Sequence, residues 1–119
     1  MTFYVDIWLR GEETAHTCAL PNLSRDPRDW TDDDVRLMLE GMLVEMHRLK
    51  FPQDEEHPVS VRSLSWIVNP YEDGGVVVAI EVSLGAAIAG PFDADRAQLE
   101  AMISRVISQT RGVTSATVH

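Results

Sequence analysis

The sequence is poor in cysteine and in positive charge, and both scarcities restrict the classes of protein to which it belongs. Its single cysteine, Cys18, rules out an internal disulfide and fits a reducing compartment, so we expect a cytoplasmic protein. Ten basic residues, of which only Lys50 is a lysine, stand against nineteen acidic residues and give a net charge of −9. Because this charge repels phosphate backbones, we expect no direct binding of nucleic acid.

The chain also lacks long hydrophobic runs and motifs for catalysis or cofactor binding. Its most apolar stretch, residues 76–90, is interrupted by Glu81 and is too short to span a bilayer, so we expect no membrane partner. The glycine-containing segments carry neither a phosphate-loop lysine nor a G-x-G-x-x-G fingerprint. His16 and Cys18 make at most half of a metal site, and no second pair of ligands has matching spacing. We therefore predict no catalytic residue, no metal and no cofactor.

Hydrophobic periodicity predicts one α+β domain over residues 1–119. Thr31 is suited to cap a first helix and Asp93 a second, which Gly112 would end. The expected elements, in chain order, are a strand over 2–10, a short strand or loop over 14–20, a helix over 32–50, a hairpin of strands over 59–70 and 76–84 with a continuation over 85–92, a helix over 94–109 and a last strand over 113–118. This order predicts a ferredoxin-like (split βαβ) antiparallel sheet of four or five strands, with two helices packed on one face.

The apolar stripes of the helices and strands predict which side chains form the core. The residues expected to be almost fully buried are Val5, Ile7, Leu39, Leu43, Val78, Ile80, Ile103 and Val106. A second, narrower stripe on the first helix consists of Leu37 and Val44 with Gly41 between them. The glycine indicates that another segment packs closely against this stripe.

The first strand alternates so that its second face carries the aromatic residues Tyr4 and Trp8 together with Asp6 and Arg10. Helices on one side of the sheet would leave this second face uncovered, and it is too apolar to be simply hydrated. The residues predicted to form an interface there are Tyr4, Asp6, Trp8, Arg10, Ile67, Val77 and Ala79. We predict a homodimer made sheet to sheet, and the alternative is an internal lid in which residues 11–30 cover the face with Leu20, Leu23 and Trp30.

The negative charge is concentrated in residues 26–57, which supply −6 of the −9. One interpretation of this charge is solubility, and the other is attraction of a basic protein partner. The residues assigned to such a partner-binding acidic surface are Asp32, Asp33, Asp34, Glu40, Asp54, Glu55 and Glu56.

Taken together, these features favour a small acidic binding or regulatory protein without enzymatic activity, such as an inhibitor, an immunity-type protein or an accessory subunit. The alternative is a small enzyme, because the predicted element order resembles that of the antibiotic-biosynthesis-monooxygenase group. The resemblance implies a cofactor-free dimeric enzyme with Trp, Asn and His in a pocket between sheet and helices. Trp66, Asn69 and His47 supply these residue types, but no motif of the group is matched, so none is assigned a role.

Overall fold

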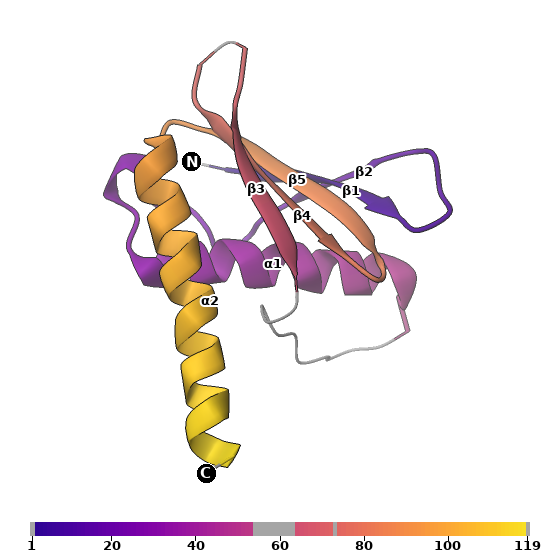
Figure 1. Cartoon of the computed structure of the whole chain (residues 1–119). Coiled ribbons are helices and arrows are strands. Elements are labelled where there is room, and N and C mark those ends of the chain that lie inside the picture. Colours follow the sequence, from indigo (N-terminus) through magenta and orange to yellow (C-terminus); the bar gives the residue numbers. More distant parts are fainter. Residues whose placement is uncertain (1, 54–63, 73, 119) are drawn as a thin grey trace.

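The computed structural model describes residues 2–53, 64–72 and 74–118, with the backbone alone described for residues 110–118. Within these residues the chain forms one antiparallel sheet with two long helices (Figure 1). In chain order the elements are β1 (Tyr4–Leu9), β2 (His16–Ala19), the 3-10 turn η1 (Pro27–Asp29), α1 (Asp32–Lys50), β3 (Ser65–Pro70), β4 (Val76–Val82), β5 (Gly85–Phe92) and α2 (Arg96–Val118). The α+β class and the antiparallel sheet are therefore as predicted.

The spatial order of the strands is β2-β1-β5-β4-β3, and the ferredoxin-like split βαβ order is not confirmed. The segment 85–92 is not a bent continuation of β4 but a separate strand, which pairs with β1 on one side and β4 on the other. The segment 113–118 is not a last strand, because α2 continues through it to Val118. The short strand at 14–20 is present as β2, paired antiparallel with β1.

Strand β5 occupies the centre of the sheet because its residues are small enough to fit there. Ala87 and Ala89 are fully buried on the face that α1 covers, where larger side chains would hold the helix away. Gly85 lies so close to β1 that a Cβ atom would collide with the backbone carbonyl of Trp8. The same small residues have low strand propensity, which hides the strand in the sequence.

Helix α1 begins where its capping residues require. The Thr31 hydroxyl accepts a hydrogen bond from the Asp34 backbone amide, and the Asp34 carboxylate accepts one from the Thr31 amide at 2.9 Å. Helix α2 begins at Arg96, where the side chain of Asp95 accepts a hydrogen bond from the Gln98 amide at 3.0 Å, so Asp95 rather than Asp93 caps it.

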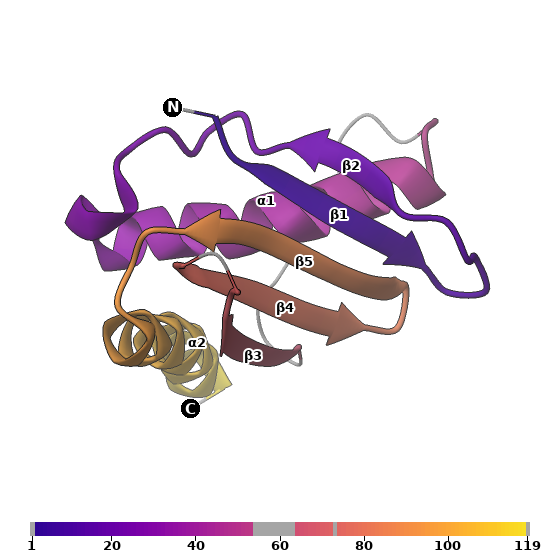
Figure 2. The same ribbon diagram turned by 90° about the horizontal axis from the view of Figure 1, so that it is seen from above.

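The core lies between one face of the sheet and the two helices, which cross steeply in Figure 1. Apolar side chains of α1, α2 and the sheet form a single buried cluster. The prediction of the core is confirmed, since none of its members is more than 7% exposed: Val5, Ile7, Leu39, Leu43, Val78, Ile80, Ile103 and Val106. Figure 2 shows the sheet in front of α1, so the opposite face of the sheet is turned toward the viewer.

Candidate functional site

The face of the sheet turned away from α1, called the open face below, is the leading candidate for a functional surface. Strand alternation and register place these residues on it: Tyr4, Asp6 and Trp8 of β1, Ala86 and Ile88 of β5, Val77, Ala79 and Glu81 of β4, and Ser65, Ile67 and Asn69 of β3. Tyr4 is 54% exposed, Ile67 49% and Ile88 39%. Large apolar side chains therefore remain in contact with water on this face.

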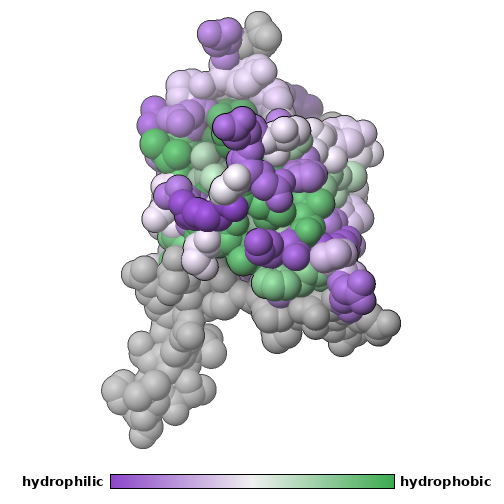
Figure 3. Space-filling view, turned by 90° about the vertical axis from the view of Figure 1, so that its right-hand side faces the viewer, coloured by the Kyte–Doolittle hydropathy of each residue, from purple (hydrophilic) through white to green (hydrophobic). Residues whose placement is uncertain are grey.

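The register brings these side chains into rows that cross the sheet. Ile88 is the cross-strand neighbour of Asp6 and of Ala79, and Ala79 is in turn the neighbour of Ile67. In the adjacent row Ala86 pairs with Trp8 on one side. Because each row contains one small residue at an inner position, Ala79 or Ala86, a shallow hollow of about 310 Å³ forms between the larger side chains. Figure 3 views the side of the molecule toward which this face is tilted and shows hydrophobic side chains gathered among hydrophilic ones.

Two polar side chains at the border of the open face, Asp6 and Arg10, are bonded within the chain. The Thr17 hydroxyl donates to the Asp6 carboxylate at 2.6 Å. The Arg10 guanidinium donates to the backbone carbonyls of Val82 at 3.0 Å and of Ser83 at 3.3 Å, which ties the end of β1 to the turn between β4 and β5. Asp6 and Arg10 thus have partners in their own chain and are held in place at the border of the face.

The internal lid proposed as an alternative is not present. Leu20, Leu23 and Trp30 are each at most 7% exposed, and they lie in the core on the helix side of the sheet. The Trp30 ring packs edge-on against Phe92 and Phe3, with ring centroids 4.9 and 5.8 Å apart. Residues 11–30 therefore leave the open face uncovered, because their own apolar side chains complete the core.

The residues predicted to form an acidic surface have different roles in the structure. Asp32 forms a two-pronged ion pair with Arg105 of α2, at 3.0 Å, and these hydrogen bonds hold the pKa of Asp32 below its usual value. Asp33 pairs with Arg36 at 3.4 Å, and Asp34 belongs to the helix cap.

The first two aspartates therefore pair with arginines of the same chain, and the third caps α1. Glu40 lies farther along the same helix. Asp54, Glu55 and Glu56 fall outside the described residues.

The residue types that suggested an enzyme, at Trp66, Asn69 and His47, do not come together in one pocket within the described part of the chain. Trp66 and Asn69 lie on opposite faces of β3, so they cannot line one pocket with His47. His47 is buried beside Phe51, with ring centroids 4.8 Å apart.

His16 and Cys18, which could form half of a metal site, also have neighbours in their own chain. His16 is bonded to Glu12 at 3.0 Å. Burial, with a contribution from Glu45, raises the pKa of the Cys18 thiol. Within the described part of the chain, no group of three His, Cys, Asp or Glu side chains is placed to hold a metal ion.

The sequence patterns predicted the part of the open face on β1, β3 and β4 and missed the part on β5. The predicted residues Tyr4, Trp8, Ile67, Val77 and Ala79 all lie on it. The contributions of β5, Ala86 and Ile88, were missed because their segment was not recognised as a separate strand. The available signal was the short, uninterrupted apolar run 86–89 between two glycines, which is typical of a buried strand.

None of the helices in residues 2–53, 64–72 and 74–118 is both long and apolar enough to cross a membrane.

Comparison with known proteins adds no assignment. No protein-family model matches the sequence, no curated protein matches it significantly, and no solved structure matches the fold significantly.

Proposed function

We propose that the protein is a non-enzymatic binding protein and that its open face is an interface with a second copy of the same chain. The observation that carries this proposal is the exposure of Tyr4, Ile67 and Ile88 on one continuous face. Aromatic and branched aliphatic side chains supply much of the energy of protein interfaces when they are removed from water. Removal of these three side chains from water by a bound partner would therefore stabilise the complex.

The size of the face suits a dimer. Five strands about 4.8 Å apart, with a mean length of roughly 20 Å, give a projected area of about 500 Å². Protruding side chains raise the accessible area toward the roughly 800 Å² per partner of a standard interface. The open face as a whole is therefore close to the minimum for a stable dimer, and its centre would have to be well packed.

The shape of the face favours a second copy. A two-fold axis places the same surface on both partners, so a face that pairs with itself needs a protrusion and a matching recess. Ile67 and Ile88 supply the protrusions, and the hollow at Ala79 and Ala86 supplies the recess. The apolar side chains around the hollow and the bonded Asp6 and Arg10 at the border also match the usual arrangement of interfaces, and Glu81 beside the hollow is the one charge that a partner would have to accommodate among these residues.

Sedimentation of the wild type and of an Ile67→Ser/Ile88→Ser variant tests this proposal. We expect a wild-type dimer at about tens of micromolar and a monomeric double variant, because the dimer is linked to concentration through the apolar face. Leu37→Ser is the matched control, since Leu37 is 41% exposed but lies on α1, away from the open face. A monomeric wild type, or a folded double variant that remains dimeric, would refute the proposal.

A further inference from the structure

Helix α1 carries a second apolar surface that the core does not use. Leu37, Gly41 and Val44 follow one another at helical spacing on the outer side of the helix. The segment 20–23 runs alongside this stripe, and a Cβ atom at Gly41 would lie 3.2 Å from the Leu20 side chain. The close packing predicted from the glycine is thus made by Leu20. It leaves a groove between the helix and the segment.

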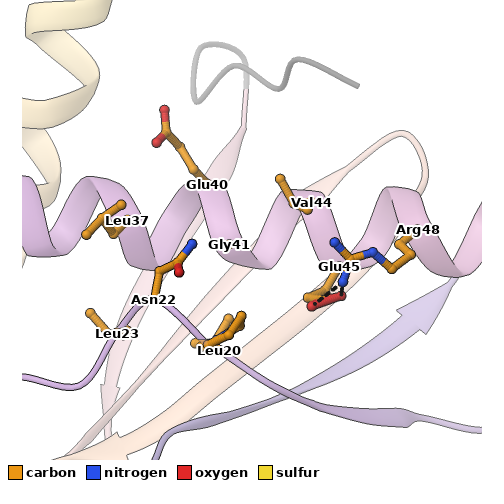
Figure 4. A pocket seen from close by; sticks show the side chains of 10 residues that line it. Leu20, Asn22, Leu23, Leu37, Glu40, Gly41, Val44, Glu45 and Arg48 are labelled. Carbon is orange, nitrogen blue, oxygen red and sulfur yellow. Dashed lines mark hydrogen bonds and ion pairs between the residues drawn. The ribbon is translucent and has the colours of Figure 1, made fainter. Parts of the chain in front are cut away.

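The groove has the form of a helix-binding site. Its cavity of about 340 Å³ extends along α1 from Leu37 to Arg48, which is roughly 16 Å, or three helical turns. Figure 4 shows Leu20 and Leu23 on one side of it and Leu37 and Val44 on α1. Apolar side chains at positions i, i+3 or i+4, and i+7 of a partner helix cover this length.

The charges at the border of the groove specify the sign of the charge that a partner should carry. Both Arg48–Glu45 contacts measure 3.0 Å, so the charge of Glu45 is neutralised within the groove. Glu40 also lines the groove, and in the described part of the chain it has no hydrogen-bond or ion-pair partner. The uncompensated charge is therefore negative, as is the chain with its −9. A second copy packed groove to groove would bring its own Glu40 against this one and be repelled there, whereas a cationic segment would be attracted.

We propose that the groove between α1 and segment 20–23 binds a short amphipathic helix of a partner protein. The helix would place its apolar residues on Leu37, Gly41 and Val44 and a lysine or arginine beside Glu40. The groove lies on the opposite side of the sheet from the open face, so this proposal does not depend on the proposed dimer and is tested separately from it.

Titration of isotope-labelled protein with two synthetic peptides, followed by amide NMR shifts, tests the proposal. The peptides share leucines at i, i+3 and i+7 and differ only in carrying arginine or glutamate at the flanking positions. We expect the arginine peptide to shift residues 20, 37, 41 and 44 saturably below millimolar concentration, and the glutamate peptide to bind about tenfold more weakly. The Glu40→Arg variant should bind the arginine peptide about tenfold more weakly than the wild type. Glu13 is an exposed glutamate between β1 and β2, and the Glu13→Arg variant should bind this peptide with unchanged affinity.

Four results would overturn the proposal. They are the absence of saturable shifts at these residues, equal affinity for both peptides, an equal loss of affinity in the Glu40→Arg and Glu13→Arg variants, and shifts confined to the open face. Groove shifts that depend on protein concentration alone would instead assign the groove to a second copy of the chain. The amide spectrum of each variant shows directly whether its fold is retained.

Discussion

Truncation of Leu43 to alanine should destabilise the protein far more than the same change at Leu37. Both leucines belong to α1, but Leu43 is 7% exposed within the core and Leu37 is 41% exposed in the groove. Buried Leu→Ala substitutions cost about 2–5 kcal/mol, since they remove packed atoms and leave a cavity. Complete burial of a leucine contributes about 1.5–3 kcal/mol, and Leu37 keeps much of its surface in water, so we expect a loss below about 1 kcal/mol there.

Urea unfolding followed by far-ultraviolet circular dichroism measures both effects. With a slope of about 1–3 kcal/mol per molar urea, a loss of about 3 kcal/mol lowers the midpoint by roughly 1–3 M. The Leu37→Ala midpoint should remain close to that of the wild type at an unchanged slope. A loss under about 1 kcal/mol for Leu43→Ala, or equal losses for both variants, would show that the core face of α1 is assigned incorrectly.

Three further predictions follow from named contacts. Asp32→Asn should lower stability at pH 7, because Arg105 depresses the pKa of Asp32 in the folded protein. The difference in stability from the wild type should vanish as the pH falls through that pKa. A difference that does not depend on pH would contradict the role of this ion pair. Cys18, whose pKa is raised by burial, should react with a thiol reagent more slowly in the folded protein than in urea, and equal rates would refute its placement. Gly85→Ala should lower the urea midpoint much more than Ala97→Gly on the exposed side of α2, because the new Cβ atom at position 85 would meet the Trp8 carbonyl. Comparable midpoints for the two variants would contradict the close approach of β5 to β1.

The elements that could be predicted are those whose signals are local. Helix α1 has its cap at Thr31, acidic residues in its first turn and an apolar stripe that continues to its end, so its bounds and buried face were both correct. The alternation of β1 likewise fixed which of its residues face the core. These signals depend on side chains within a few positions, and tertiary packing did not override them.

The elements that could not be predicted depend on the rest of the fold. Strand β5 is rich in alanine and glycine because it lies under α1 and beside β1, and neither neighbour is visible in its own sequence. Gly112 was expected to end α2, but a glycine costs a helix only about 1 kcal/mol relative to alanine, which is too little to require an end. The open face was therefore predicted on β1, β3 and β4 and missed on β5.

The contact between two open faces is tested most directly by isotope-filtered nuclear Overhauser measurements on a mixture of labelled and unlabelled protein. The sheet-to-sheet dimer predicts signals between the Ile88 methyl groups of one copy and the Ile67 or Ala79 methyl groups of the other. These residues are cross-strand neighbours along one row of the face, so signals from within one copy must be removed by the filter. Intermolecular signals confined to α1 or α2, or none at concentrations above tens of micromolar, would contradict the account.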